Sequence, residues 1–177
     1  MKTAVLMDQY GRNLLRALQD NVRASVADLS RQIGLSQTRT AERLRRLEET
    51  GIIQGYTVEI DREVLGLPIL GFIRFTCSGG NYRKFLAFVK SLEQVEECHH
   101  TTGGDAFLLK VSVASMDDLE KLIESLLPFG DPTTSLVLSS PVAKRGLPIA
   151  GATIGRQSAE RGLHNPSTTT TSPETHT

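Results

Sequence analysis

The residues of this chain best suited to bind an anion are four arginines between positions 39 and 46. At about 100° per residue of an α-helix, Arg39, Arg43 and Arg46 fall within roughly 60° of arc, whereas Arg45 lies off that cluster. Guanidinium groups bind phosphate oxygens and the hydrogen-bonding edge of guanine. Small polar residues lead the segment, beginning with Ser36. The arrangement is typical of a helix that enters a groove of DNA by its first turn.

The residues before this segment predict a helix, a tight turn and a second helix. Ser25 and Asp28 have the spacing of a capping box, in which each residue satisfies a free backbone N–H at the start of a helix. Gly34 stands where a left-handed residue commonly ends a helix, and Ser36 is a candidate cap for the next one. Helix, glycine turn and helix together predict a helix-turn-helix.

An earlier helix is expected from Met7 to Leu18, with Asp8 as its cap. Gly11 lies inside that helix and is expected to weaken it by roughly 1 kcal/mol relative to alanine. After the arginine-rich helix, residues 52–61 alternate in the manner of a strand and could form a wing or a linker strand.

In the arginine-rich helix we expect Ala41, Leu44 and Leu47 to face the core, because they share one side. Arg39 and Arg43 should carry most of the contact with DNA, and Arg46 should support them. The small polar residues should read base edges. The candidate DNA-binding residues are Ser36, Gln37, Thr38, Arg39, Thr40, Arg43 and Arg46.

A solvated surface helix is the alternative interpretation of the same residues. Glu42 stands three and four positions before Arg45 and Arg46, the spacing of ordinary ion pairs on an exposed helix. The capped helix and glycine turn that precede the segment favour DNA binding over this alternative.

Charge is distributed unevenly along a chain whose formal net charge is zero. Residues 1–55 hold nine Lys and Arg against six Asp and Glu, and residues 56–145 hold nine against twelve. A basic head on an acidic body is expected for a DNA-binding protein with a second function. The sequence has no apolar run of about 18 residues and no signal peptide pattern, so we expect a cytoplasmic protein without a membrane anchor.

The middle of the chain predicts a second, α+β domain with the element order βαββαβ. Apolar alternation predicts strands and helical spacing predicts helices, with Gly103 and Gly104 joining two of the strands in a hairpin. This order is typical of a ferredoxin-like fold, which carries its helices on one face of the sheet. The other face holds the apolar Leu70, Phe72 and Leu108, so we expect a homo-oligomer. The predicted strands are 69–77, 95–102, 106–114 and 133–140, and the predicted helices are 81–92 and 115–127.

Other chemistry finds little support in the sequence. Cys98, His99 and His100 place two ligands on one face of a strand and one on the other, and a zinc site needs three or four. We therefore expect no metal, no cofactor and no catalytic residue. An RNA-binding module would need stacking aromatics on its central strands, and only Phe107 lies near such a position.

Taken in order, these motifs resemble the Lrp/AsnC family of transcriptional regulators. The resemblance covers roughly residues 5–143 and is carried by MDQYGRNLLRALQDNVRASVADLSRQIGLS, RLRRLEETGIIQGYTVEID and ECHHTTGGDAFLLKV. It implies a winged helix-turn-helix head, a strand linker and an Lrp-type sensor body that pairs into a homodimer, with dimers often assembling further. It implies a sequence-specific regulator that responds to an amino acid or a related metabolite. The alternative is a tetrapyrrole-pathway decarboxylase, an enzyme class that shares this two-part architecture.

The resemblance also assigns residues to an effector loop. Gly103 matches the glycine that opens this loop, and the expected effector-binding residues are Thr102, Gly103, Gly104 and Asp105. Two positions depart from the family. Gly11 stands where the family usually has a second acid, and Ala106-Phe107 stands where an Asp-Tyr pair is common. The second departure bears on which ligand is bound.

The expected domains are a helix-turn-helix head over residues 1–55, a strand linker over 56–67 and a sensing and oligomerisation domain over 68–145. Residues 146–177 are rich in Gly, Ser, Thr and Pro and nearly free of large apolar residues, so we expect a disordered tail.

Overall fold

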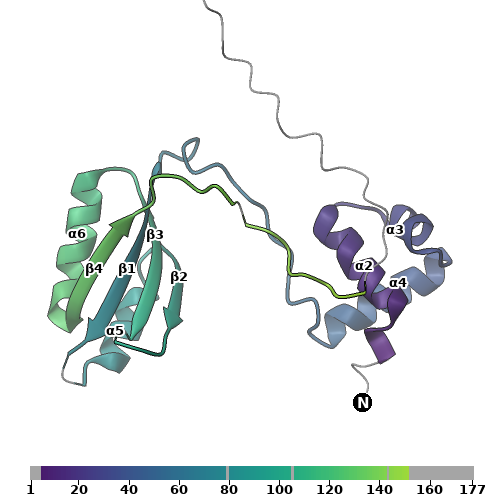
Figure 1. Ribbon diagram of the computed structural model, residues 1–177, viewed down its shortest axis with the longest axis horizontal. Helices are drawn as coiled ribbons and strands as arrows, with labels where there is room; N and C mark the ends of the chain where they lie inside the picture. Colours follow the sequence, from purple (N-terminus) through teal and green to yellow (C-terminus); the bar gives the residue numbers. More distant parts are fainter. Residues whose placement is uncertain (1–4, 79, 105, 143, 152–177) are drawn as a thin grey trace, which may run out of the picture. The chain divides into compact units, whose positions relative to one another are not determined.

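The computed structural model describes residues 5–78, 80–104, 106–142 and 144–151. The chain divides into two compact units, one formed by residues 1–56 and 145–177 and the other by residues 57–144 (Figure 1). Most of the predicted tail, residues 152–177, lies outside the described residues. Within the described ranges, no helix combines the length and apolar character that crossing a bilayer requires.

The first unit is a helix-turn-helix of α2 (Gln9–Asp20), α3 (Val26–Ile33) and α4 (Gln37–Glu49). The predicted caps are confirmed. Ser25 and Asp28 form a complete capping box, Gly34 ends α3 with a φ of 73°, and the Ser36 hydroxyl accepts a hydrogen bond from the Arg39 N–H. Leu14, Leu29 and Leu47 come from the three helices and form the centre of their common core.

Two expectations about this unit are wrong. Ala41 is exposed and Thr40 is fully buried, because the inward stripe of α4 runs through Thr40, Leu44 and Leu47. Gly11 is required rather than merely tolerated. A Cβ atom there would lie 1.7 Å from the Leu6 carbonyl oxygen, so only glycine allows the preceding turn to fold back against α2.

The second unit has the predicted βαββαβ order, with a short 3₁₀ turn before its last strand. The sheet order is β2-β3-β1-β4 and every neighbouring pair is antiparallel, as a ferredoxin-like fold requires. The elements are β1 (Ile69–Cys77), α5 (Tyr82–Val89), β2 (Val95–His100), β3 (Phe107–Val113), α6 (Met116–Leu126), η1 (Leu127–Phe129) and β4 (Gly130–Leu136).

Both helices of this unit cover the same face of the sheet. Phe75 of β1 stacks on Phe85 of α5 with ring centroids 4.2 Å apart, and Leu109 and Leu122 extend the same core toward α6. Strand alternation puts Leu70, Phe72 and Leu108 on the opposite face, where they are only partly buried. That face carries no helix of the described chain.

Among the predicted strands, the last one and the segment 52–61 differ most from the structure. The last strand runs from Gly130 to Leu136, not from 133 to 140, because its pairing with β1 begins at Gly130, opposite Cys77, and ends at Leu136, opposite Gly71. Residues 52–61 were expected to form a strand, but they form none in this structure. An extended segment becomes a strand only when another strand pairs with it, and this segment has no strand partner in the described part of the chain.

A polar network joins the segment before β1 to the edge of the sheet. Arg62 donates two hydrogen bonds to Glu96, which also accepts from Lys110 and from the Ser112 hydroxyl. The hydrogen bonds from Arg62 are the main cause that lowers the pKa of Glu96 to about 2. Burial opposes them, and Ser112 and Lys110 add to the lowering.

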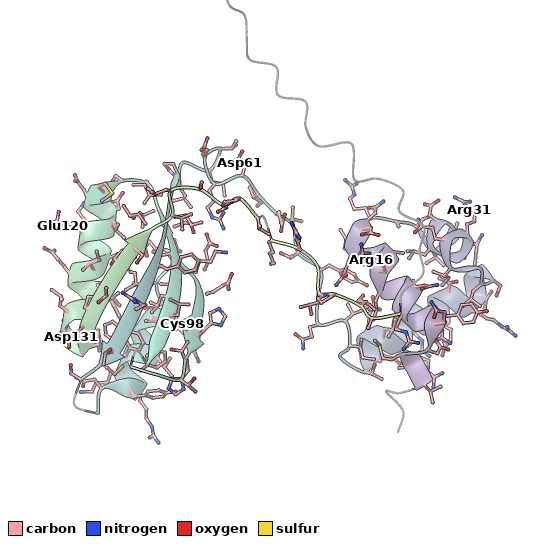
Figure 2. All side chains as sticks on the ribbon, in the orientation of Figure 1. Arg16, Arg31, Asp61, Cys98, Glu120 and Asp131 are labelled. Carbon is pink, nitrogen blue, oxygen red and sulfur yellow. The ribbon has the colours of Figure 1, made fainter. Side chains whose placement is uncertain are left out.

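This network predicts acid sensitivity of the second unit. The pKa of Glu96 is depressed in the folded state, so its contribution to stability is complete above the unfolded-state pKa of about 4.5 and disappears as the pH falls toward about 2. Glu96→Gln should therefore lower stability at pH 7 and reduce the further decrease between pH 5 and 2, measured by urea unfolding across that range. Glu120→Gln, at an exposed acid on α6 that Figure 2 labels, is the matched control. An unchanged pH profile in Glu96→Gln would contradict this assignment.

Candidate nucleic-acid interface and effector loop

The arginines of α4 separate into paired and unpaired groups. Arg45 bonds Glu42 and Glu49 on its own helix. Arg43 donates to both oxygens of Asp8, at 2.6 and 2.9 Å. Arg39 and Arg46 have no acidic partner among the described residues, and both are exposed. They stand seven positions apart on one face of α4, so the charge that remains free to meet an external anion is concentrated there.

Asp8 joins the start of α2 to the middle of α4. Its carboxylate accepts the Gly11 N–H at 2.9 Å as the helix cap, while it also holds Arg43. Burial disfavours the ionised form, but the hydrogen bonds from Gly11 and Arg43 outweigh it and lower the pKa of Asp8. Tyr10 flanks the same guanidinium, whose carbon lies 5.9 Å from the ring centre.

A hollow of about 510 Å³ lies between α4 and the residues at and before the start of α2. One wall comes from Leu6, Asp8 and Tyr10, and the other includes Thr38 and Arg39. From the sequence, Tyr10 had no expected role in the interface, and Asp8 was expected only as a cap. An aspartate N-cap is a local signal, whereas its pairing with an arginine spans 35 positions and has no local signature.

The predicted DNA-binding residues do not all lie at the surface. Gln37 and Thr38 are exposed in the first turn of α4, where Ser36 forms the cap. The Thr40 hydroxyl donates to the Ser36 carbonyl oxygen at 3.0 Å, and its side chain has no exposed surface. Arg43 is only 20% exposed at its side chain. Thr40 therefore has no access to a base edge, and Arg43 is held by the protein itself.

The predicted effector loop connects β2 and β3. The Thr101 N–H donates to the Ala106 carbonyl oxygen at 2.9 Å and closes the hairpin. Thr102, Gly103 and Gly104 are exposed, and Gly103 has a φ of 115°, which favours glycine. Asp105 lies outside the described residues.

Three aromatic rings adjoin this loop, and no pattern in the sequence groups them. His100 stacks on Phe107 with centroids 5.0 Å apart, and Tyr82 lies 5.3 Å from Phe107 and 5.6 Å from His100. His100 and Phe107 are the last residue of β2 and the first of β3, so their proximity follows from the hairpin. Tyr82 reaches them from α5, a contact that only the tertiary fold creates.

The cysteine and histidine run, Cys98 to His100, forms the end of β2. No cluster of three His, Cys, Asp or Glu side chains suited to a metal ion exists among the residues that the structure describes. Cys98 packs against the core, and burial raises the pKa of its thiol. His99 instead lies on the exposed side, with its Nε2 atom 3.0 Å from Glu97.

Two family models match the chain in the order of its two units. A winged helix-turn-helix DNA-binding model matches residues 7–54, and the Lrp/AsnC ligand binding domain matches residues 70–147. The first therefore covers α2 to α4, and the second covers the sheet and the loop between β2 and β3.

Curated relatives and solved structures agree with these models. The chain is 31% identical over 140 residues to the HTH-type transcriptional regulator LrpC of Bacillus subtilis, and the match covers 79% of this chain and 97% of LrpC. It is 40% identical over 125 residues to the leucine-responsive regulatory protein of Salmonella typhimurium, covering 68% of this chain and 76% of the relative. A Neisseria meningitidis transcriptional regulator, solved as a complex with L-Met, superposes with a TM-score of 0.76 at 27% identity, covering 81% of this chain and 97% of that one.

Arg43 and Arg39 should contribute differently to the stability of the first unit, because only Arg43 pairs with an acid of the described chain. Arg43→Ala should lower the free energy of unfolding by about 1 kcal/mol, because it leaves Asp8 without its partner. Arg39→Ala should change it by less than about 0.5 kcal/mol, since Arg39 is exposed and has no acidic partner in the described chain. Urea unfolding of both variants measures the difference. Equal stability of the two variants would contradict a structural role for Arg43.

Proposed function

This chain belongs to the Lrp/AsnC family of DNA-binding transcriptional regulators, and we propose which of its residues contact DNA and which contact an effector. The proposed domains are a head over residues 1–55, a linker over 56–67 and a sensing and oligomerisation domain over 68–145. The relatives are transcriptional regulators, and we infer that this chain is a regulator with no enzymatic activity of its own. We also infer a cytoplasmic location, where its DNA would be found.

The proposed DNA-contacting surface is the exposed face of α4 together with its first turn. Arg39 and Arg46 are the principal contacts, because their charges are not neutralised by acids of the described chain. Ser36, Gln37 and Thr38 meet base edges at the end of the helix that enters the groove. Arg43 positions α4 through Asp8 rather than leading the contact, and buried Thr40 is omitted from the set.

We propose that the regulator acts as a homodimer on two-fold symmetric sites. The support is the sheet face without helices, where Phe72 keeps 36% of its surface exposed between partly buried Leu70 and Leu108. A second copy of the same face would remove this apolar surface from water. Further assembly of dimers is consistent with the family.

The first experiment is selection of genomic DNA fragments by the purified protein at near-physiological salt, followed by salt titration on an enriched site. The expected result is enrichment of a few two-fold symmetric sites. Arg39→Ala and Arg46→Ala should each weaken binding, because each removes a cation that neutralises the DNA backbone. The slope of log affinity against log salt should fall by about 1 for every phosphate that is no longer neutralised.

Arg45→Ala is the control for this experiment, because it removes the same charge from the same helix at a position neutralised by Glu42 and Glu49. The slope of log affinity against log salt for Arg45→Ala should match that of the unaltered protein. Equal decreases in all three variants would mean that DNA senses only the net charge of α4. Absence of any enriched site would overturn the proposed interface.

The proposed effector is an amino acid or a closely related metabolite, and its proposed contacts are Thr102, Gly103, Gly104 and Asp105. The support is the match of this region to the Lrp/AsnC ligand binding domain, together with the L-Met complex of the Neisseria relative. The adjoining aromatic rings of Tyr82, His100 and Phe107 offer apolar surface to an amino-acid side chain.

Thermal unfolding with each L-amino acid in turn, at fixed protein concentration, tests the effector proposal. A ligand that binds only the folded state should raise the Tm in a saturable way. Thr102→Val removes one exposed hydroxyl and should raise the half-saturating concentration about tenfold. Thr57→Val, at an exposed linker threonine, should leave it unchanged. If no amino acid shifts the Tm of the unaltered protein, this effector class is wrong.

A further inference from the structure

A stripe of polar side chains follows the face of α2 that is turned away from its helical core. Gln9, Arg12, Arg16 and Gln19 fall within roughly 80° of arc, opposite buried Leu14. Arg16 is labelled on this helix in Figure 2. The stripe belongs neither to the core of the first unit nor to the contacts between α2 and α4.

The last described residues of the chain contact this stripe at two points. The Gln19 amide, oriented with its nitrogen toward the Leu147 carbonyl, donates to Leu147 O and accepts from Leu147 N, each at 3.1 Å. At the other end of α2, Gln9 Nε2 donates to the Gly151 carbonyl oxygen at 2.8 Å. The two glutamines are ten helical positions apart, about 15 Å along α2, so their hydrogen bonds hold Leu147 near one end of the helix and Gly151 near the other.

Two glycines allow the segment to approach α2 this closely. A Cβ atom on Gly146 would lie 2.8 Å from the Cδ atom of the Gln19 amide and would displace the amide that holds Leu147. Gly151 has a φ of 75°, and a Cβ atom there would lie 3.3 Å from the Nε atom of Arg12. The contact depends on backbone and amide groups more than on apolar surface, since Leu147 is 77% exposed.

We propose that residues 145–151 form a strap that docks on the polar stripe of α2. The chain passes from the first unit to the second near Tyr56 and returns near Arg145. A docked strap is therefore a second tether between the sensor unit and the helix-turn-helix, in addition to the linker. Two tethers restrict the rotation of the helix-turn-helix more than one does.

The position and strength of the contact indicate a releasable tether and not an inhibitor. The stripe lies on the side of α2 opposite its core face, while α4 packs on the core side, so an occupied strap leaves Arg39 and Arg46 exposed. The hydrogen bonds from Gln9 and Gln19 to the strap join partly exposed groups, which contribute modestly in water. Such a contact opens and closes at equilibrium.

Limited proteolysis of the full chain tests the strap without DNA or effector. Trypsin cleaves after Arg145, at the start of the segment, and cleavage after this residue is quantified by mass spectrometry. Gln9→Ala/Gln19→Ala should accelerate this cleavage about tenfold, because cleavage follows the population of the undocked state. Gln32→Ala removes an exposed glutamine from the neighbouring helix α3 and should cleave at the rate of the unaltered protein.

A second variant keeps the test valid if removal of the Gln9 bond to Asn13 weakens α2. Gly146→Val leaves α2 unaltered, places a side chain against Gln19 and should accelerate the same cleavage. Gly55→Val is its control, since no atom lies within 4 Å of a Cβ built there. Equal cleavage rates in all these proteins would overturn docking. Nitrogen-15 relaxation should show faster tumbling of α2 to α4 in the undocked variants, and unchanged tumbling would overturn the tethering role.

Discussion

The ion pair between Asp8 and Arg43 fixes the orientation of α4's middle arginine and removes its charge from those available to a ligand. Asp8 is fixed by its own role as the cap of α2, so its carboxylate sits at a defined place beside α4. Arg43 therefore points toward Asp8 and is largely buried. Arg39 and Arg46 are exposed and have no acidic partner in the described chain. Gly11 permits the close approach of the preceding turn, and Asp8 is the acid that holds the arginine.

In the second unit, strand geometry separates the core from the loop between β2 and β3, the proposed effector loop. One face of the sheet holds the stacked phenylalanines and both helices, and the hairpin between β2 and β3 projects the glycine loop from the end of that layer. The aromatic cluster of Tyr82, His100 and Phe107 links the loop to this core. A ligand that orders the loop would therefore act on residues packed against α5, which is a physical route from the loop into the sheet.

The two units are joined by the covalent chain at two places, and the second place ends in contacts with α2. A regulator must transmit the state of its sensing domain to its DNA-binding helices, and a single extended linker transmits little. The strap adds a connection whose strength is set by a few exposed hydrogen bonds. Such a connection is weak enough to be released by a modest change in the sensor unit.

The local patterns of the sequence were sufficient for most of the fold. Capping at Ser25 and Ser36, the left-handed turn at Gly34 and the apolar alternation of the strands act over a few residues, so the helix-turn-helix and the βαββαβ order followed from them. The tertiary structure alone decided that Thr40 and not Ala41 turns inward, that Gly11 is required, and that residues 52–61 have no strand partner in the described chain. It also decided which arginines of α4 have no acidic partner in the described chain, and where Leu147 and Gly151 dock. These features depend on contacts between distant parts of the chain or on the detailed packing of neighbouring helices. Such contacts leave no periodic signal in the sequence.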